Sequence, residues 1–393
     1  MKRAIALILA LTTLLLATIF IDAATTANEE ISPLTYSKEN PKNLEISAPS
    51  AILIEATTGT VLYYKNQAEK RSPASVTKIM TLLLVCEALE NERIKSTDTV
   101  IISEYAASMG GSQVFLEEGE SFTVEELLKC TVIASANDAA VALAELICGT
   151  EGNFVAEMNK RAKELGMGNT NFENVSGLDD TTTAHLTSAE DIAIMSRELI
   201  KYDIILKYSS LWQDSIRNGE FQLTNTNRLV RFYDGCNGLK TGSTDKAGFC
   251  VSASAKRDGM QLIAVIMGAE TRDLRNADAR ALLDFGFSTY GLYQKDEEIL
   301  ESVRVKNGTS NNVIVKSKPF ACVVSKSDLK KVEQFFEIPE SITAPFSADK
   351  VIGEIKFKIG DNLIGSTDIY TTEPMERIGF WKLFLKMIES ILK

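Results

Sequence analysis

The sequence predicts an α+β protein: an antiparallel sheet with a cluster of helices, followed by a small all-β domain and a C-terminal amphipathic helix. Two observations lead to this fold class. Strand-like apolar runs occur near residue 51 and again near residues 248 and 262, and they flank a stretch whose apolar residues recur at helical spacing. After about residue 292, short strand-like runs alternate with polar turns. The 393 residues suffice for two folded units.

The first domain, residues 44–291, is expected to begin with a β-hairpin. Two apolar runs, 51–56 and 61–64, are separated by a turn that contains Gly59, which is typical of a hairpin. Pro73 then opens a helix that is apolar on nearly all sides and is therefore expected to be buried. The later elements are predicted from the same two periodicities: helices over 124–148, 153–165, 188–202 and 277–285, and strands over 248–254 and 262–267.

Residues 292–373 are expected to form the all-β domain. Their strand-like runs are short and are bounded by polar turns, which is typical of a small β module. We expect strands over 303–306, 311–315, 321–324, 351–355 and 368–370.

The N-terminus has the layout of a secretory signal peptide. Lys2 and Arg3 precede an apolar run over 4–21, and small residues follow that run. The predicted signal therefore spans residues 1–24, and the polar stretch 25–43 is a predicted linker. The apolar run is also nearly long enough to cross a bilayer, so an uncleaved N-terminal anchor is the alternative. We expect the protein to be exported to the extracytoplasmic face of the cell membrane.

The last stretch, residues 374–393, is predicted to be an amphipathic helix on the membrane surface. Ile378, Trp381, Leu385 and Ile388 recur at helical spacing, with lysines between them. This segment is basic although the whole chain carries a formal charge of −11, and a basic amphipathic helix with aromatic residues is typical of a membrane interface. The alternative is a helix that packs on the all-β domain.

Composition excludes several classes of function. A formal charge of −11 argues against nucleic acid as the main partner, because phosphate binding needs a positive face. The single histidine, His185, excludes a zinc site with several histidines, and we expect it to be a structural hydrogen-bonding residue at a helix entrance. Six cysteines are too few for a disulfide scaffold, although Cys236 and Cys250 bracket a predicted hairpin and could form one pair.

Ser75 and Lys78 are candidates for nucleophilic catalysis. They lie three residues apart on the predicted buried helix, so the lysine can reach the serine hydroxyl. Burial would lower the pKa of the lysine, and its neutral amine could then activate the serine, which is otherwise a weak nucleophile. The same spacing also begins at Ser243, Ser327 and Ser347, but only the Ser75 copy lies on an apolar helix.

Two further motifs follow along the chain. Ser135 and Asn137 are two residues apart in a small-residue segment, a weak signal because residues 310–312 fit the same pattern and buried hydroxyls are often structural. The tripeptide Lys-Thr-Gly occurs once, at residues 240–242. It is predicted to lie on the edge of a strand, where Gly242 would let a substrate backbone approach and an extended peptide could add as a further strand.

In this order, the three motifs resemble the signature of the penicillin-binding protein and serine β-lactamase superfamily. Within it, the chain resembles the low-molecular-mass D-alanyl-D-alanine carboxypeptidases from about residue 51 to the C-terminus. The likeness extends to the segments around the motifs, at residues 72–81, 134–140, 174–178, 238–244 and 256–260. It implies a β-lactamase/transpeptidase-like catalytic domain, a β-rich second domain, a C-terminal anchor and a reaction that needs no metal or cofactor.

The resemblance also implies a role for each candidate residue. Ser75 would be the nucleophile, Lys78 its general base and Ser135 a proton relay. Six residues would bind the substrate, which is a peptidoglycan stem peptide ending in D-Ala-D-Ala: Asn137, Lys240, Thr241, Gly242, Ser243 and Arg275. The backbone N–H groups of Ser75 and Ser243 would form the oxyanion hole. Arg275 would lie near the terminal carboxylate of the substrate, with Arg272 as a close competitor.

Two other functions share part of this pattern. A class A β-lactamase deacylates with a glutamate, and the closest string, which begins at Glu220, does not fit the motif of that class. Penicillins are therefore expected to inhibit the protein by acylating it. A catalytically silent peptidoglycan-binding module is the second alternative, but a binding module has no need of the complete set of Ser75, Lys78, Asn137 and Lys240.

Overall fold

The computed structural model describes residues 34–37, 40–41, 44–179, 182–382, 384 and 388. The predicted signal peptide lies outside the described residues, as do most of the predicted linker and much of the predicted C-terminal helix. Within the described ranges, helices and strands alternate in a first domain, and strands dominate after it. The predicted α+β class is therefore confirmed.

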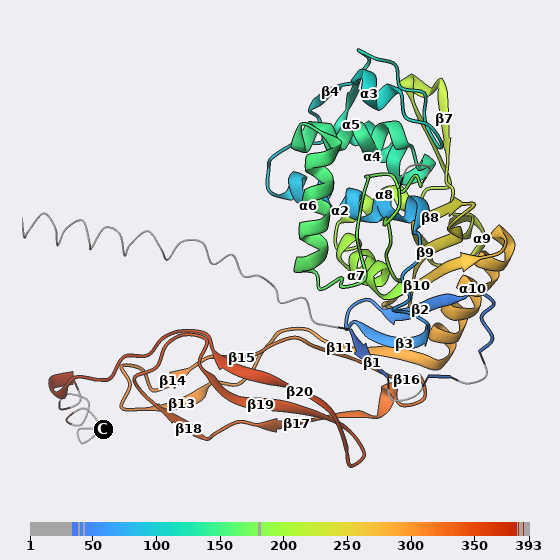
Figure 1. The fold of residues 1–393 in the computed structure, drawn as a ribbon. Helices are drawn as coiled ribbons and strands as arrows, with labels where there is room; N and C mark the ends of the chain where they lie inside the picture. The colour runs from blue at the N-terminus through green and yellow to red at the C-terminus, as the bar shows by residue number, and fades with distance from the viewer. Residues whose placement is uncertain are drawn as a thin grey trace, which may run out of the picture. The chain divides into compact units, whose positions relative to one another are not determined.

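A six-stranded sheet lies at the centre of the first domain (Figure 1). Its strand order is β1-β3-β2-β10-β9-β8, and neighbouring strands are antiparallel except for β1 and β3. The strands are β1 (Thr35–Tyr36), β2 (Ser50–Glu55), β3 (Thr60–Lys65), β8 (Cys236–Thr244), β9 (Gly248–Arg257) and β10 (Met260–Ala269). The early hairpin thus pairs with the late one, and β8 forms an open edge of the sheet.

The core of this domain lies on both faces of the sheet. On β10, Leu262, Ala264 and Ile266 share one apolar cluster with residues of α10 (Arg272–Thr289). Successive side chains of a strand point to opposite faces, so Ile263 and Val265 face the other side, where α7 (Ala189–Leu199) contacts the strand. Burial on both faces explains why β10 is apolar along almost its whole length.

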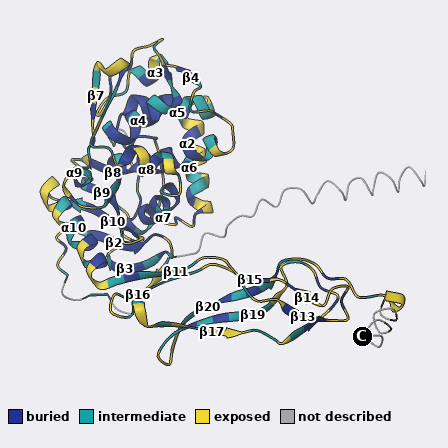
Figure 2. Ribbon diagram, turned by 180° about the vertical axis from the view of Figure 1, so that it is seen from behind, coloured by how far each residue is buried: buried dark blue, intermediate teal, exposed yellow. Residues whose placement is uncertain are grey.

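A layer of helices covers the α7 side of the sheet. Its helices are α2 (Lys78–Glu90), α3 (Glu104–Ala107), α4 (Val124–Lys129), α5 (Asn137–Cys148), α6 (Glu151–Glu164) and α8 (Asp203–Ser209), while the short α9 (Leu229–Phe232) precedes β8. Helix α2 contacts α5, α6 and α7 and is buried along most of its length, as its apolar sequence predicted. Figure 2 shows the buried residues concentrated in α2, α4, α5, α7 and the central strands.

The predicted helix over 124–148 is wrong, because the structure interrupts it. Helix α4 ends at Lys129, a π-helical turn follows over Cys130–Ala134, and Ser135 adopts a left-handed conformation with φ of 62° before α5 begins at Asn137. Apolar and small residues occupy both sides of this break, so hydrophobic periodicity does not mark it. The chain also forms two short two-stranded sheets that were not predicted. Strand β4 (Thr99–Ile101) pairs with β5 (Ser121–Thr123) across the segment that contains α3, and β6 (Gln213–Ile216) forms a hairpin with β7 (Phe221–Thr224).

The possible disulfide between Cys236 and Cys250 does not form. All six cysteines are free, and the ladder between β8 and β9 places Cys236 opposite Ala255 and Cys250 opposite Gly242. The two cysteines therefore lie five residues apart along the hairpin, or about 17 Å at roughly 3.3 Å per residue, whereas a disulfide needs Cα atoms within about 7 Å.

The second domain is built from strands, as predicted. Strand β11 (Tyr290–Lys295) pairs with β16 (Phe320–Ser325), and two further sheets have the orders β12-β15-β20-β19-β17 and β14-β13-β18. Their strands are β12 (Glu298–Ile299), β13 (Val303–Lys306), β14 (Asn312–Val313), β15 (Val315–Ser317), β17 (Val332–Glu337), β18 (Ser341–Thr343), β19 (Val351–Ile359) and β20 (Asn362–Thr371). The sequence did not indicate β11, β12, β17 and β18.

Two observations bear on membrane segments. No single helix among the described residues is long and apolar enough to cross a membrane, although α5 and α6 pass that test together as a pair bent by 84°. At the start of the predicted C-terminal helix, Phe380 and Trp381 are 73% and 75% exposed.

Candidate active site

The Ser75 turn is the segment Ala74–Lys78, where the chain enters α2. A single 3₁₀ turn, Ala74–Thr77, precedes the α-helix, so the predicted helix at Pro73 begins with a tighter turn than expected. Tight i-to-i+3 geometry places residues three apart directly above one another. The turn therefore brings Lys78 Nζ to 3.0 Å from Ser75 Oγ.

Lys78 is completely buried and is held by three oxygen atoms. Besides Ser75 Oγ, its Nζ lies 2.6 Å from Asn137 Oδ1 and 2.9 Å from the carbonyl oxygen of Ser176. These three contacts come from three separate segments: the Ser75 turn, the start of α5 and the loop at residues 174–178. The amine is thus fixed in position and points at the serine hydroxyl.

The electrostatic environment favours the neutral form of Lys78. Burial lowers its pKa well below the usual 10.5, and the nearby positive charge of Lys240 lowers it further, while Asp138 acts in the opposite direction. A neutral amine has a lone pair that can accept the proton of Ser75. The site therefore contains a hydroxyl and a base within hydrogen-bonding distance.

Ser135 and Asn137 lie where the π-helical turn ends and α5 begins. Ser135 Oγ is buried and has no hydrogen-bond partner among the described residues, so its hydroxyl is available to a bound molecule. The Asn137 side chain is already engaged: Oδ1 accepts from Lys78, and Nδ2 donates to the carbonyl oxygen of Gly110 at 2.7 Å. In this state Asn137 orients the lysine and holds the loop that carries Ser112, whose carbonyl oxygen accepts from the Asn137 backbone N–H.

The Lys-Thr-Gly motif lies on β8, the open edge strand of the central sheet. Lys240 is buried, and its Nζ donates to the carbonyl oxygen of Thr241 at 3.0 Å. Burial and the charge of Arg275 lower the pKa of Lys240 to about 7. The Thr241 hydroxyl donates to Thr226 Oγ1, and Ser243 is exposed at the end of the motif.

Gly242 allows β8 to pack directly against the Ser75 turn. A Cβ atom at this position would lie 2.7 Å from the Pro73 carbonyl oxygen and 2.8 Å from the Ser75 backbone nitrogen. Only a residue without a side chain permits this approach. Gly242 was expected to admit a substrate backbone; in the structure it also admits the backbone that carries the candidate nucleophile.

Gly177 plays the same part on the other side of the turn. It has φ of +79°, and a Cβ atom there would lie 1.8 Å from the Ala74 carbonyl oxygen. Residues 174–178 were predicted only to share the family likeness, with no role for Ser176 or Gly177. Gly177 and Ser176, whose carbonyl oxygen accepts from Lys78, are therefore part of the candidate site and were not predicted.

A pocket of about 410 Å³ opens next to the Ser75 turn. Six of the predicted site residues line it: Ser75, Ser135, Thr241, Gly242, Ser243 and Arg275. The other three, Lys78, Asn137 and Lys240, are buried behind this lining and act on it through hydrogen bonds and charge.

Other pocket-lining residues were not predicted. Ser112 lies on the loop after α3, Trp212 and Thr224 lie at the two ends of the β6–β7 hairpin, and Arg228 precedes α9. Arg272, the competitor of Arg275, also lines the pocket. No local motif distinguishes these residues, because tertiary packing alone brings their segments together.

His185 is structural, as expected. It is buried, its Nδ1 accepts from the backbone N–H of Glu173 at 3.0 Å, and its Nε2 lies 2.8 Å from Thr77 Oγ1. Since Nδ1 is the acceptor, the proton of the neutral ring is on Nε2, which donates to Thr77. Burial lowers the pKa of His185 to about 4. The histidine therefore holds the Ser75 turn in place as a neutral group.

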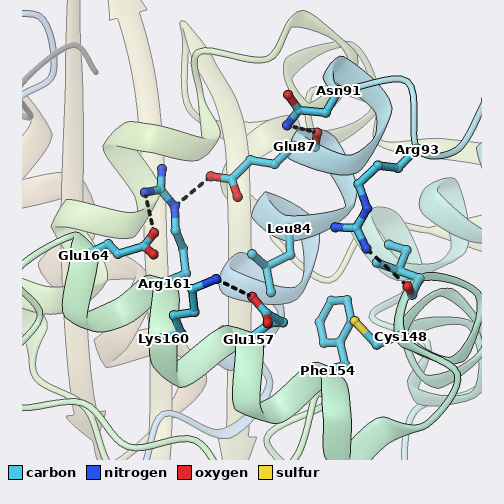
Figure 3. A pocket seen from close by; sticks show the side chains of 11 residues that line it. Leu84, Glu87, Asn91, Arg93, Cys148, Phe154, Glu157, Lys160, Arg161 and Glu164 are labelled. Atoms are coloured by element: carbon cyan, nitrogen blue, oxygen red, sulfur yellow. Dashed lines mark hydrogen bonds and ion pairs between the residues drawn. The ribbon is translucent and has the colours of Figure 1, made fainter. Parts of the chain in front are cut away.

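A second, smaller pocket of about 160 Å³ lies between α2, α5 and α6 (Figure 3). Its lining is dominated by ion pairs, such as Arg161 with Glu87 and Lys160 with Glu157. None of the predicted site residues line it. The catalytic candidates are therefore confined to the larger pocket.

Comparison with known proteins agrees with this arrangement. Residues 36–271 match the family model described as D-alanyl-D-alanine carboxypeptidase, and residues 287–377 match the model described as the penicillin-binding protein 5 C-terminal domain. Over 360 residues the chain is 44% identical to D-alanyl-D-alanine carboxypeptidase DacF of Bacillus subtilis, an alignment that covers 89% of this chain and 92% of the relative. DacA of Escherichia coli is 32% identical, with 98% and 95% covered.

Solved structures give the same result. Penicillin-binding protein 5 of Haemophilus influenzae is 30% identical and superposes with a TM-score of 0.75, covering 87% of this chain and 100% of the other. Penicillin-binding protein D2 of Listeria monocytogenes, in its ampicillin-bound form, is 31% identical, with a TM-score of 0.57 and coverage of 62% and 99%. The chain therefore belongs to the D-alanyl-D-alanine carboxypeptidase family of penicillin-binding proteins.

Proposed function

We propose that the protein is a serine-type carboxypeptidase that removes the terminal D-alanine from peptidoglycan stem pentapeptides through an acyl-enzyme on Ser75. The observation that carries this proposal is the 3.0 Å contact between Ser75 Oγ and a buried lysine amine of lowered pKa. A serine with a neutral base at this distance fits acyl transfer. The relatives named D-alanyl-D-alanine carboxypeptidase support the choice of substrate.

Acylation would begin with attack by Ser75 Oγ on the carbonyl carbon of the penultimate D-alanine. Lys78 Nζ takes the hydroxyl proton, and the backbone N–H groups of Ser75 and Ser243 donate to the developing oxyanion. The C–N bond then breaks, and the leaving amine takes up a proton. Ser135, whose hydroxyl has no partner among the described residues, would relay that proton.

Substrate binding would depend on the edge strand and on the positive charges behind it. The open edge of β8 can pair with an extended peptide as an additional strand. The terminal carboxylate would lie near Thr241 and Arg275, with Lys240 behind them. This assignment makes Thr241, Gly242, Ser243 and Arg275 direct substrate contacts, while Asn137 and Lys240 shape the site from behind its lining.

The structure offers no support for rapid hydrolysis of penicillins. None of the residues that line the pocket in the described chain is a carboxylate, and Glu220, the nearest sequence candidate, is exposed and does not line it. A penicilloyl group on Ser75 would lack the base that activates deacylating water in many β-lactamases. We therefore infer that β-lactams inhibit the protein by stable acylation.

One experiment separates these activities. The mature protein is incubated with a stem pentapeptide and, separately, with a chromogenic cephalosporin, and products are followed by mass spectrometry and absorbance. Release of D-alanine without turnover of the cephalosporin supports the carboxypeptidase. Fast cephalosporin turnover would indicate a β-lactamase, and neither reaction together with no penicillin adduct would indicate a binding module.

We further propose that the protein works outside the cytoplasm, exported by residues 1–24 and attached to the membrane surface by residues 374–393. Support for the anchor comes from the exposed aromatic rings of Phe380 and Trp381. Deleting residues 375–393 should abolish flotation with anionic liposomes and leave D-alanine release unchanged. Equal flotation of both forms, or loss of activity on deletion, would exclude the anchor.

A further inference from the structure

The larger pocket carries an excess of positive charge. Its lining contains three arginines, Arg228, Arg272 and Arg275, and no aspartate or glutamate among the described residues. This is unusual on a chain whose formal charge is −11. Asp273, the nearest acidic neighbour in sequence, is exposed and does not line the pocket. A pocket of this composition selects anionic groups.

The three arginines are not equivalent. Arg275 is buried and is fixed by the protein, with its guanidinium donating to Asn276 Oδ1 and to the carbonyl oxygen of Cys250. Arg272 and Arg228 are exposed, and no hydrogen bond or ion pair of their side chains exists among the described residues. Their guanidinium groups are therefore free to bind a ligand.

The backbone that carries Arg228 and Arg272 is fixed by hydrogen bonds, and both arginines are close to Arg275. Arg272 opens α10, whose N-terminus is capped by Thr271 and contributes further positive potential. Arg228 follows a segment that Asn225 and Asn227 fix through side-chain hydrogen bonds to three backbone carbonyls. Each of the two charges is near enough to lower the pKa of Arg275, which falls to about 10 mainly through burial.

One terminal carboxylate cannot use all of these donors. A carboxylate accepts about four hydrogen bonds, and one bidentate guanidinium already supplies two of them, so three arginines offer more donors than one carboxylate can use. Arg272 lies one helical turn before Arg275 and lines the same pocket, so it adds positive charge beside the position proposed for the terminal carboxylate. The terminal carboxylate belongs to the leaving group, so donors that adjoin Arg275 lie beside the part of the substrate that leaves.

We propose that Arg228 and Arg272 form a second anion-binding subsite that recognises an additional carboxylate on the leaving group. This inference rests on the proposed carboxypeptidase function and refines its substrate class. Released D-alanine has one carboxylate. A peptide that is released when a cross-link is cleaved carries more than one. The pocket is thus suited to cleaving a bond to an acidic leaving group as well as to releasing D-alanine.

The test uses three synthetic peptides that differ only in the last residue: D-alanine, D-glutamate or D-glutamine. D-Glutamate adds a second carboxylate, and D-glutamine has the same shape without the charge. We expect kcat/KM for D-glutamate release to exceed that for D-glutamine release by ~3–10-fold at low salt, the range of partly exposed charge pairs. The ratio should fall toward 1 in 0.5 M salt, because screening weakens exposed pairs.

One double variant and one control variant assign the effect to the two arginines. In Arg228→Gln combined with Arg272→Gln, the ratio should be close to 1 even at low salt. Arg304→Gln, an exposed arginine on β13 of the second domain, changes the charge equally outside the pocket and should keep the wild-type ratio. Covalent labelling by penicillin, measured on every variant, shows whether the Ser75 turn remains folded.

The outcomes are distinct. No release of D-alanine by the wild type would refute the proposed function itself. Release of D-alanine with a ratio near 1 in the wild type would refute the second subsite while leaving the carboxypeptidase intact. A high ratio that survives in the double variant would show that other residues recognise the second carboxylate.

Discussion

Ser75 with Lys78 and Ser327 with Lys330 have the same spacing, a serine followed three residues later by a lysine. Only the Ser75 turn has the features of an active site; the second segment, residues 327–331, is called the Ser327 turn. Both lysines adjoin or lie in a 3₁₀ turn, Ala74–Thr77 in the first domain and Leu329–Lys331 in the second. In the first, Lys78 is buried and bonded to three oxygens. In the second, Lys330 is exposed, and the Ser327 hydroxyl bonds to that of Ser325.

This difference shows where the chemistry of the motif originates. Spacing places the two side chains on one face, but burial lowers the pKa of the lysine, and burial is supplied by other segments. Around the Ser75 turn these are β8, the loop at 174–178 and His185, none of which has a counterpart at Ser327 among the described contacts. The Ser75 turn differs from the Ser327 copy in that three distant parts of the chain enclose it.

The largest expected effect comes from replacing the buried lysine. In Lys78→Arg, a guanidinium cannot lose its proton near neutral pH, so the acylation rate should fall by about 10²–10⁴-fold, the usual contribution of a general base. The matched Lys330→Arg should be indistinguishable from wild type. Stopped-flow acylation by a fluorescent penicillin measures both. Retention of most of the rate in Lys78→Arg would mean that Lys78 acts only as a charge.

Gly242→Ala should have the next largest effect. The added Cβ would press on the Ser75 backbone nitrogen, which is the proposed oxyanion donor, and losing one such donor costs about 10²–10³-fold in rate. Gly168→Ala is the control, because a Cβ there meets nothing within 4 Å. The two variants are compared by kcat for D-alanine release. Equal rates would show that the packing of β8 on the Ser75 turn is unimportant for catalysis.

Arg217→Ala should weaken the pocket more moderately. From the tip of the β6–β7 hairpin, Arg217 donates to the carbonyl oxygens of Val114 and Phe115 and pairs with Glu120, so it joins the hairpin to the loop that carries Ser112. We expect kcat/KM to fall by roughly tenfold, with faster hydrogen exchange over 112–116. Arg217→Lys should restore little, because lysine cannot make the forked contacts. Unchanged hydrogen exchange over 112–116 would show that Arg217 does not hold this loop in place.

The last prediction concerns acid stability and leaves the reaction rate at neutral pH unchanged. The folded-state pKa of His185 is about 4, below its unfolded value of about 6.5, so its stabilising contribution is complete above pH 6.5 and is lost as pH falls toward 4. We expect this histidine to account for roughly 2–3 kcal/mol of the acid-induced loss in unfolding free energy. Urea titrations at pH 4.5 and 7 should therefore show a smaller difference in His185→Gln. An equal difference would assign the loss to carboxylates alone.

The sequence was sufficient to predict part of this arrangement. Ser75, Lys78 and Lys240 follow from motifs whose residue types and order are specific, and the sheet follows from apolar runs at both ends of the first domain. Ser135 was predicted as a site residue but was placed inside a helix, because periodicity cannot reveal a left-handed residue among small apolar neighbours. Gly177, Arg217 and Arg228 were not predicted, since their roles depend on contacts between segments far apart in the chain.

The most direct test of the central claim is to locate the penicillin adduct. The mature protein is labelled with a penicillin, digested and mapped by tandem mass spectrometry, beside Ser75→Ala and Ser327→Ala. We predict one modified peptide, carrying the adduct on Ser75, in the wild type and in Ser327→Ala, and no adduct in Ser75→Ala. An adduct on Ser327, Ser243 or Ser135, or one that persists in Ser75→Ala, would contradict the claim that burial of Lys78 makes this serine the nucleophile.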